Sequence, residues 1–171
     1  MELKHFEKVT DKQHLVQIYE LLAMYDKEFI PPLSGRSSTT QASLDSTAQA
    51  ENGVKDYFDV MIQQDMVLAL EGDRVAGFMA FRRDYTCEYI QRTPNLYAST
   101  CLVHPDFRGQ KLMQRFYEAM MAAFPGFPIY TRTWHTNVSH LRVLEKLGFR
   151  LLKHLENHRG PGIHTVYYGR E

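Results

Sequence analysis

The chain has 171 residues, a length that suits one domain with a hydrophobic core of its own. Apolar residues make up 44% and charged residues 23%, as in an ordinary globular protein. Lys and Arg together number 20 and Asp and Glu also number 20, so the net charge is zero. This balance argues against a dedicated nucleic-acid-binding protein and against a protein of anionic membrane surfaces, because both normally carry excess basic charge.

Cysteine use and the first residues indicate the compartment. Cys87 and Cys101 form neither a paired-cysteine motif nor a zinc pattern, and two thiols in a chain of this size fit a reducing compartment. The opening MELKHF lacks the apolar run of a secretory signal, and no apolar stretch approaches the roughly 20 residues of a membrane span. We therefore expect a cytoplasmic protein with no membrane partner and no nucleic-acid partner.

The N-terminal part of the chain predicts a strand, a helix and a loop. Residues 2–9 alternate weakly, as in a strand, and Thr10 or Asp11 can cap the helix that follows. The apolar side chains of this helix recur every three or four residues, at Leu15, Ile18, Leu22 and Tyr25. The helix is expected to end near Ile30, because two prolines follow. Residues 31–41, rich in proline and hydroxyl side chains, predict a loop.

The rest of the chain predicts an alternation of helices and strands. Residues 43–64 favour a helix, and residues 65–71 and 74–81 favour two strands joined by a hairpin turn at Gly72-Asp73. The remaining elements are a strand 96–104, a helix 107–124, a strand 127–134, a helix 137–147 that ends at Gly148, and a hairpin of 149–156 with 163–169. The predicted fold class is α/β (α+β mixed), a mixed sheet flanked by helices in the order β-α-α-β-β-β-α-β-α-β-β.

One connection in this order has the features of an anion-binding site. Residues 101–109 predict a strand that enters a proline turn and reaches Gly109 just before a helix. The first N–H groups of a helix have no partner within the helix, and together with the helix dipole they favour phosphate or pyrophosphate. Gly109 permits close approach of a ligand, and Arg108 and Lys111 add positive charge. The alternative is a strand-to-helix connection that binds nothing.

Two motifs resemble those of a known family. Residues 103–109, VHPDFRG, resemble the V-x-P-x-[FY]-R-G turn of the GCN5-related N-acetyltransferase (GNAT) superfamily. Asn137 followed by VLEKLGF at 143–149 resembles the "N…lYeklGF" element of that family. The order of elements and the length also agree, so the resemblance covers essentially residues 1–171 as one domain. It implies a twisted, mostly antiparallel mixed sheet of about six or seven strands with about four helices.

The resemblance implies acetyl-CoA as acyl donor and assigns residues to it. The turn residues would hold its pyrophosphate: Arg108, Gly109, Gln110, Lys111, Leu112 and Met113. The preceding strand would pair with its pantetheine arm and offer an N–H to the thioester oxygen, through Cys101, Leu102 and Val103. Asn137 would contact the pantetheine where neighbouring strands separate.

The sequence departs from the family pattern in two places. Lys111 and Met113 occupy the two small positions of the usual phosphate loop, R-x-x-G-x-G/A. The lysine could pair with phosphate or crowd the loop, and we expect CoA binding to be retained. Leu144 stands where the family often has the tyrosine that protonates the leaving thiolate. His140 shares a helix face with Leu144 and could replace that acid, or could merely fill the groove or touch the pantetheine.

The remaining candidates concern proton removal and the acceptor. His135 ends the strand before Asn137 and could act as the base, or could be structural or cap the helix. The candidates for binding the acceptor are Tyr25, Phe29, Arg36, Glu88 and Tyr89, with Arg36 suited to a carboxylate or phosphate. Cys101 lacks the signature of a nucleophile, which favours direct transfer. No set of histidines has tight metal-ligand spacing, and we predict no metal.

These features predict an N-acetyltransferase that moves an acetyl group from acetyl-CoA to a primary amine of a small molecule or peptide. Two alternatives remain. One is a non-catalytic domain that binds or senses acyl-CoA, suggested by Leu144 and the altered glycine positions. The other is a module that binds a different phosphorylated ligand at the Arg108-Gly109 turn. The resemblance also allows a homodimer.

Overall fold

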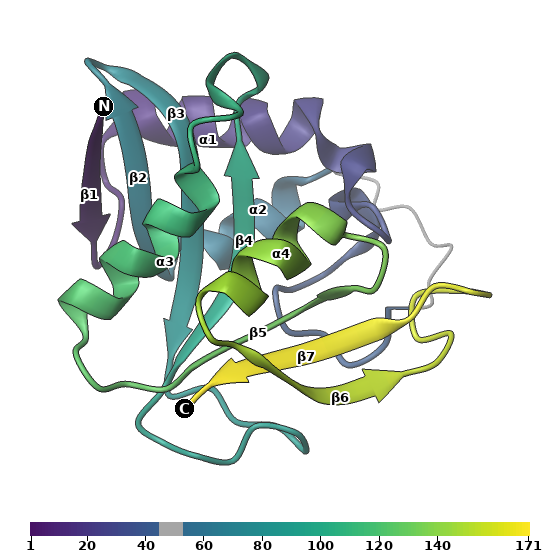
Figure 1. The fold of residues 1–171 in the computed structure, drawn as a ribbon. Coiled ribbons are helices and arrows are strands. Elements are labelled where there is room, and N and C mark those ends of the chain that lie inside the picture. Colours follow the sequence, from purple (N-terminus) through teal and green to yellow (C-terminus); the bar gives the residue numbers. More distant parts are fainter. Residues whose placement is uncertain (45–52) are drawn as a thin grey trace.

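The computed structural model describes residues 1–44 and 53–171, and its centre is one seven-stranded sheet in the order β1-β2-β3-β4-β5-β7-β6 (Figure 1). The strands are β1 (Glu2–Phe6), β2 (Asp65–Glu71), β3 (Arg74–Arg83), β4 (Leu96–Val103), β5 (Ile129–Trp134), β6 (Arg150–Leu155) and β7 (Thr165–Arg170). The helices are α1 (Lys12–Met24), α2 (Lys55–Met61), α3 (Leu112–Ala123) and α4 (Val138–Lys146), with short 3-10 turns η1 (Asp26–Glu28), η2 (Leu33–Gly35) and η3 (Pro105–Phe107). The predicted fold class and element order are confirmed.

Two hydrophobic cores lie on opposite faces of the sheet. The helices α3 and α4 cover one face, and α1 and α2 cover the other (Figure 1). Alternate residues of β2 serve the two cores: Val67 faces α3, whereas Met66 and Leu68 face α1 and α2. Because both faces are covered, β2 reads as a continuous apolar run instead of an alternating one.

Several helix boundaries differ from those predicted. The N-cap of α1 is Asp11, whose carboxylate accepts the N–H of His14 at 3.0 Å, but the helix ends at Met24, six residues early. The chain tightens into η1 there, and the Asp26 carboxylate accepts the Ser34 N–H at 2.8 Å. Of the predicted helix 43–64, the structure shows α2 alone, and residues 45–52 lie outside the described residues.

The third helix starts later than the apolar pattern suggested. The prediction placed its start at Phe107, whereas α3 begins at Leu112. Gly109 has φ +81° and Lys111 has φ +58°, and an α-helix cannot contain these left-handed conformations. The chain from Phe107 to Lys111 is therefore a turn that presents the N-terminus of α3, with the first helical N–H groups exposed.

The sheet is interrupted between its two central strands. Strands β4 and β5 are parallel and pair over only three residues each, Leu96–Ala98 with Ile129–Thr131. Beyond this point β4 follows β3 as far as Val103, whereas β5 follows β7 as far as Trp134, and the arrows diverge (Figure 1). A β-bulge at Ser99 marks the start of the divergence, because Ala80 pairs with Thr100 and Phe81 with Ala98. We call the opening between residues 99–103 and 132–134 the seam.

Candidate functional site

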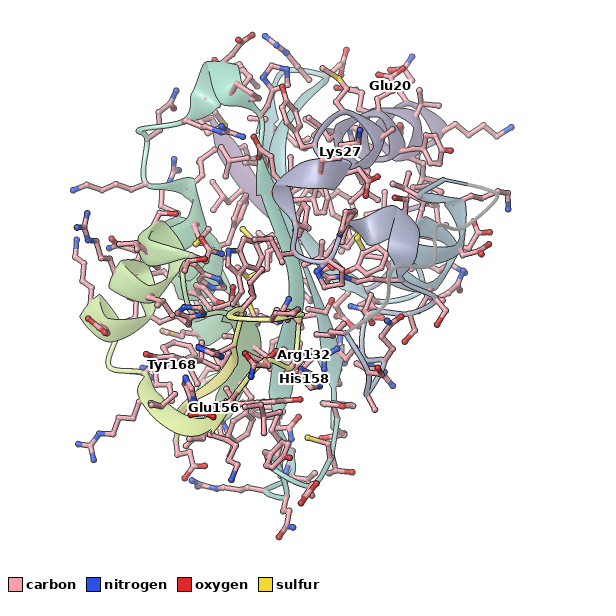
Figure 2. The ribbon with its side chains drawn as sticks, turned by 90° about the vertical axis from the view of Figure 1, so that its right-hand side faces the viewer. Glu20, Lys27, Arg132, Glu156, His158 and Tyr168 are labelled. Atoms are coloured by element: carbon pink, nitrogen blue, oxygen red, sulfur yellow. The ribbon has the colours of Figure 1, made fainter. Side chains whose placement is uncertain are left out.

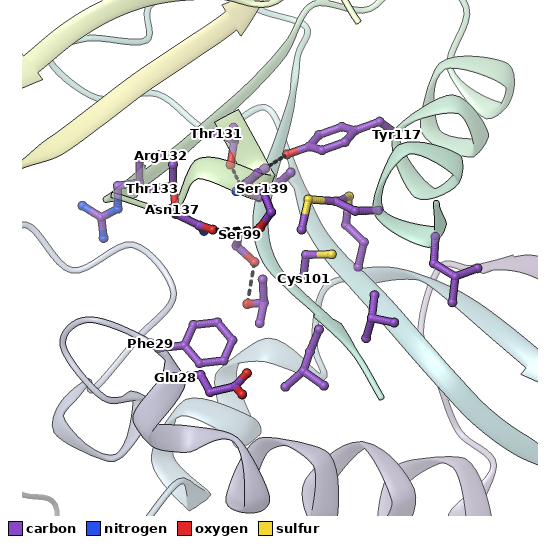
Figure 3. A pocket seen from close by; sticks show the side chains of 18 of the residues that line it. Glu28, Phe29, Ser99, Cys101, Tyr117, Thr131, Arg132, Thr133, Asn137 and Ser139 are labelled. Carbon is purple, nitrogen blue, oxygen red and sulfur yellow. Dashed lines mark hydrogen bonds between the residues drawn. The ribbon is translucent and has the colours of Figure 1, made fainter. Parts of the chain in front are cut away.

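A cavity of about 600 Å³ occupies the seam (Figure 3). Its wall is formed by the turn before α3, by the seam residues of β4 and β5, by the start of α4 and by the loop after α1. The volume falls in the range typical of small-molecule sites. Residues far apart in sequence, such as Phe29, Cys101 and Asn137, meet around it, so the cavity is a product of the fold and not of one motif.

The turn before α3 forms a cradle of free N–H groups. No hydrogen bond among the described residues engages the backbone N–H groups from Gly109 to Gln114. A Cβ placed on Gly109 would have no atom within 4 Å, so the space in front of this residue is open. Unpaired N–H groups at a helix N-terminus attract anions, and an open approach lets an anion reach them. The turn is therefore suited to phosphate or pyrophosphate.

The two basic residues of the turn are held differently. Arg108 pairs with Glu28 at 3.1 Å, donates from Nε to the Val103 carbonyl at 3.3 Å and lies over the Tyr25 ring at 5.5 Å. Lys111 is exposed and lines the cavity, and no ion pair among the described residues includes it. Lys111 is therefore the basic side chain of the turn that remains available to a ligand.

The open edge of β4 continues the site from the turn. The N–H of His104 donates to the Ala76 carbonyl on β3 at 2.8 Å. Successive backbone groups of a strand alternate in direction, so the N–H and C=O of Val103 and Cys101 point away from β3. They face the seam, where β5 has diverged. The Val103 carbonyl accepts from Arg108 Nε at 3.3 Å, and the Val103 N–H with both backbone groups of Cys101 remains for an extended ligand that pairs as a strand would.

A buried pair of polar side chains lies at the inner end of the cavity. The phenol oxygen of Tyr117, on α3, lies 2.8 Å from Nε2 of His140, on α4 (Figure 3). Burial lowers the pKa of His140 to about 4, so its imidazole is neutral at pH 7. Burial also raises the pKa of Tyr117, which keeps the phenol protonated. The pair therefore offers a hydroxyl and a neutral imidazole to whatever enters the cavity.

The start of α4 adds further polar groups. Asn137, the N-cap residue, donates from Nδ2 to the Thr133 hydroxyl at 3.0 Å. The Thr131 hydroxyl donates to the Ala98 carbonyl at 2.8 Å, just before the strands separate. Asn137, Thr131 and Thr133 all line the cavity (Figure 3). The hydrogen bond between Asn137 and Thr133 fixes the orientation of the amide at the seam.

Sequence and structure comparisons identify the family. The profile of the acetyltransferase (GNAT) family matches residues 22–149. The chain belongs to the GNAT acetyltransferase family. The match contains both motifs, the turn at 103–109 and the element from Asn137 to Phe149. Comparison with curated protein sequences gave no match.

Solved GNAT structures share the whole fold at low sequence identity. The aminoglycoside 6'-N-acetyltransferase from Enterococcus faecium superimposes with a TM-score of 0.67 and 13% identity, covering 99% of this chain and 96% of its own. An aminoglycoside 6'-N-acetyltransferase complexed with coenzyme A gives 0.68 and 14%, with coverage of 99% and 96%. The yncA protein of Salmonella typhimurium, solved with its cofactor acetyl-CoA, gives 0.63 and 14%, with coverage of 100% and 94%.

The structure accounts for one departure from the GNAT pattern. Lys111 stands where the pattern has glycine, and its φ of +58° is a conformation that glycine adopts without cost. The backbone of the turn is thus retained although the residue has changed. Leu144, at the position of the usual tyrosine, is fully buried in the core between α3, α4 and the sheet. The Tyr117 phenol reaches the GNAT cavity from the other helix.

The cavity brings together most of the residues assigned to the acyl donor. Its wall includes Cys101, Leu102, Val103, Arg108, Gly109, Lys111, Leu112, Met113, Asn137 and His140, and it omits Gln110. Of the residues assigned to the acceptor, Phe29 and Arg36 line it, while Tyr25 stacks behind Arg108. Glu88 and Tyr89 are not part of the wall, and Tyr89 packs on Tyr167 instead, at 5.0 Å between ring centroids.

His135 lies outside the cavity wall. Its Nδ1 accepts the N–H of His164 at 3.0 Å, and its own N–H donates to the His164 carbonyl at 3.0 Å. The two rings stack with 4.4 Å between centroids. This arrangement ties β5 to the segment before β7, and the structure gives no support to His135 as a base.

Three functional candidates were missed by the sequence interpretation. Tyr117, Arg132 and Arg159 all line the cavity. A signal existed for Tyr117, because a phenol on the buried face of a helix needs a polar partner. The sequence around Arg132 and Arg159 gave no such signal. Both reach the cavity only because the fold brings together two segments that are distant in sequence.

Among the described residues, Cys101 is not a thiolate nucleophile and the acidic and histidine side chains form no metal site. Desolvation raises the pKa of the Cys101 thiol to about 12, so it is not a thiolate at neutral pH. Within residues 1–44 and 53–171, no group of three or more His, Cys, Asp or Glu is placed to hold a metal ion. None of the helices in the same ranges is long and apolar enough to cross a membrane.

Proposed function

We propose that this protein transfers an acetyl group from acetyl-CoA directly to a primary amine of a small molecule or peptide. One observation carries the proposal: a single cavity joins the turn before α3, at Gly109 and residues 111–113 with their free N–H groups, to the open backbone edge of β4. An anion cradle that continues into an unpaired strand edge suits a ligand with a pyrophosphate and a long amide-bearing arm. Acetyl-CoA has this shape, and the related yncA protein was solved with it.

The chain's own groups can hold each part of the donor. The N–H groups of the turn and the Lys111 ammonium would bind the pyrophosphate. The backbone groups of Cys101 and Val103 would pair with the amides of the pantetheine arm. Asn137 faces the seam, and its amide would bind the same arm from the opposite side.

Acetyl-CoA supplies the activated acetyl group as a thioester. In the transfer, a C–N bond forms between the acetyl carbon and the amine, and the C–S bond breaks. The amine loses one proton and the departing sulfur gains one, so the products are an N-acetyl amine and CoA thiol. A backbone N–H of the open β4 edge would stabilise the charge that develops on the acetyl oxygen.

Tyr117 is the side chain that we assign to the leaving sulfur. Tyr117 is one of the residues that line the cavity, and the raised pKa of its phenol keeps it protonated as a hydrogen-bond donor. His140 would position this hydroxyl through their 2.8 Å hydrogen bond. A neutral imidazole is a weak acid, so the direct contact with sulfur is assigned to the phenol and not to His140.

Direct transfer is favoured because the described wall of the cavity offers no activated cysteine as a nucleophile. Cys101 is the one cysteine of the wall, and its pKa of about 12 leaves it protonated. Positioning the amine against the thioester then supplies much of the rate. Cys87 and Cys101 are both free thiols, which fits the cytoplasm as the site of action.

Turnover with an amine panel tests the proposal. The purified protein is incubated with acetyl-CoA and each amine, and the N-acetyl product is identified by mass spectrometry. We expect amine-dependent product together with stoichiometric release of CoA. Tight binding of acetyl-CoA without acetylation of any amine would instead indicate an acyl-CoA sensor. Failure to bind acetyl-CoA, with binding of ATP or NAD, would refute the assignment of the turn.

A further inference from the structure

Three arginines gather around the cavity from segments other than the turn. Arg36 comes from the loop after α1, Arg132 from β5 and Arg159 from the loop before β7. Arg36 and Arg159 are buried, at 9% and 6% exposure, and Arg132 is half-buried. The charge of Arg132 lowers the pKa of Arg36, and the charges of Arg36 and Arg132 both lower the pKa of Arg159, so the three lie within electrostatic range. We call these residues the arginine cluster.

The Asp26 carboxylate acts on Arg36 electrostatically, but it forms no ion pair with the arginine cluster. None of the ion pairs in residues 1–44 and 53–171 includes any of its members. Glu28 is the one carboxylate of the described cavity wall, and it is paired with Arg108 at the turn. Burial lowers the pKa of Arg159 to about 9, which still leaves its guanidinium charged at neutral pH.

Neutral oxygens hold the guanidinium groups in place. Arg36 donates from Nε and Nη2 to the Pro31 carbonyl at 3.1 and 2.7 Å. Arg159 donates from Nε to the Thr165 hydroxyl at 2.9 Å and from Nη1 to the Ile30 carbonyl at 2.6 Å. Each guanidinium carries five N–H donors, so both side chains are fixed while donors remain for a ligand.

Arg132 is held by the segment around Gln41. Its Nη2 donates to the Gln41 carbonyl at 2.8 Å, and its Nη1 donates to the Tyr167 hydroxyl at 3.4 Å. His158 lies beside Arg132 and donates from Nε2 to the next carbonyl, that of Ala42, at 2.7 Å (Figure 2). Within residues 1–44 and 53–171, the hydrogen-bond partners that fix this guanidinium at the cavity wall are neutral.

Burying several positive charges close together is costly where, as among the described residues, none of them has an ion-pair partner, and an anion that binds between them offsets part of that cost. Guanidinium groups match the oxygens of carboxylate and phosphate in pairs. We propose that the acceptor is an amine that carries an oxyanion, a carboxylate or a phosphate, and that Arg36, Arg132 and Arg159 bind that oxyanion beside the thioester. This inference rests on the proposed acetyl transfer and specifies its acceptor.

The same charges disfavour polycationic acceptors. Aminoglycosides carry several ammonium groups at neutral pH, and three guanidinium groups in one cavity would repel them. The solved aminoglycoside acetyltransferases therefore share the fold of this chain without sharing its acceptor class. Phe29 and Trp134, whose rings lie 6.2 Å apart, give the wall an apolar portion for the body of the acceptor.

Matched amines provide the first test. Acetylation rates are compared for β-alanine against β-alaninamide, for O-phosphoethanolamine against ethanolamine, and for kanamycin as a polycation. We expect kcat/KM for the anionic member of a pair to exceed that of its neutral partner about 10- to 100-fold, because hydrogen bonds to charged groups have this worth. The two pairs distinguish a carboxylate from a phosphate acceptor, and kanamycin is expected to be the poorest substrate.

Arginine variants provide the second test. Arg132→Gln should raise the KM for the anionic amine, while the KM for acetyl-CoA stays the same. The gap in kcat/KM between the anionic and the neutral member of each pair should fall to a few-fold. Arg82→Gln is the matched control, because Arg82, on β3, donates to the Thr40 hydroxyl at 2.9 Å and does not line the cavity. The gap should persist in this control. Thermal unfolding of both variants reports whether either one is misfolded.

The outcomes separate this inference from the proposed function. Equal or better acetylation of β-alaninamide, ethanolamine or kanamycin would confirm acetyl transfer and overturn the anionic acceptor. An equal loss on both members of a pair in Arg132→Gln would also overturn it. If no amine is acetylated, calorimetry with the CoA-saturated protein decides: absence of binding by both anionic amines and by inorganic phosphate refutes the inference. Failure of acetyl-CoA to bind would refute the proposed function itself.

Discussion

The Tyr117 hydroxyl and Nε2 of His140 lie 2.8 Å apart, and their contact joins α3 to α4 at the inner end of the cavity. Leu144 lies one turn further along α4 and cannot donate a proton. In the assignment that we propose, the hydroxyl that the GNAT pattern places on α4 comes from α3, and α4 contributes the imidazole that bonds to it.

Replacing Tyr117 by Phe should lower kcat about 100-fold, because the leaving sulfur would lose its hydrogen-bond donor. The KM for acetyl-CoA should change little. Steady-state kinetics with acetyl-CoA and with its selenium analogue measures the effect, and the deficit should shrink with the analogue, whose selenolate leaves without protonation. Tyr130→Phe is the control, because Tyr130 is buried but bonds to Glu171, away from the cavity. An equal deficit with both donors would argue that Tyr117 is purely structural.

Stability should fall as the pH drops from about 6.5 to about 4, because of His140. Its pKa is 6.5 in the reference state and about 4 in the folded protein, since burial opposes the charged form. Over this interval the unfolded chain binds a proton that the folded chain does not, and folding is therefore weakened as the pH falls. The expected loss is about 3 kcal/mol in the free energy of unfolding.

Urea unfolding at pH 7, 5.5 and 4.5 measures this dependence. The variant His140→Gln keeps a hydrogen-bonding side chain and cannot titrate. Its stability should decline less between pH 7 and 4.5 than that of the wild type, since all other groups are unchanged. Parallel curves for the two proteins would show that His140 is not the cause.

Replacing Gly109 by Val should raise the KM for acetyl-CoA about 10- to 100-fold, by displacing the N–H groups from the phosphate and filling the open space in front of them. The backbone strain at φ +81° should also reduce stability by about 1–2 kcal/mol. Gly126→Val is a closely matched control: φ is +79°, a Cβ would again have nothing within 4 Å, and the residue does not line the cavity. The two variants should lose similar stability, yet only the first should bind acetyl-CoA poorly.

Lys111 can be tested in two ways that separate its charge from its backbone. Lys111→Gly removes the ammonium and suits the left-handed φ of +58°, whereas Lys111→Met removes the ammonium and keeps the backbone strain. If Lys111 pairs with phosphate, both variants should raise the KM for acetyl-CoA about 10-fold, and added salt should reduce the difference from the wild type. A lower KM for Lys111→Gly would mean instead that the side chain crowds the turn.

No acetyl-enzyme should form on Cys101. Its pKa of about 12 leaves very little thiolate at pH 8, so attack on the thioester by this sulfur is suppressed. Intact-protein mass spectrometry after mixing with acetyl-CoA in the absence of amine should show the unmodified mass. An acetyl adduct that maps to Cys101 and is discharged by an added amine would contradict direct transfer.

The sequence was informative where chemistry is local. Apolar periodicity placed the strands of the hairpin at Gly72 within two residues, and the turn at Arg108-Gly109 was recognised because proline, glycine and charge lie together. The start of α3 was predicted five residues early, because a lysine in the left-handed conformation gives no sign in its sequence pattern. Local patterns report what a segment prefers, and they do not report what the fold imposes on it.

The acceptor side of the site was beyond the reach of sequence patterns. Arg36 was recognised as a candidate for binding an anion, but Arg132 and Arg159 were not associated with it. These residues lie on β5 and on the loop before β7, far from Arg36 in the chain. Their proximity arises from strand order β4-β5-β7, in which the last strand inserts beside β5. Only the three-dimensional arrangement shows that the three positively charged side chains lie around one cavity.

The seam leaves the two halves of the sheet joined by a short stretch of strand pairing. Three residue pairs, Leu96–Ala98 with Ile129–Thr131, are the strand pairing that joins its two halves. A donor arm paired with Cys101 and Val103 would act as a temporary strand that completes the sheet. At a donor concentration of about 100 times Kd, such binding adds about 2.7 kcal/mol to stability. Resistance of the protein to proteolysis would then rise and fall with the supply of acyl donor, linking its lifetime to metabolic state.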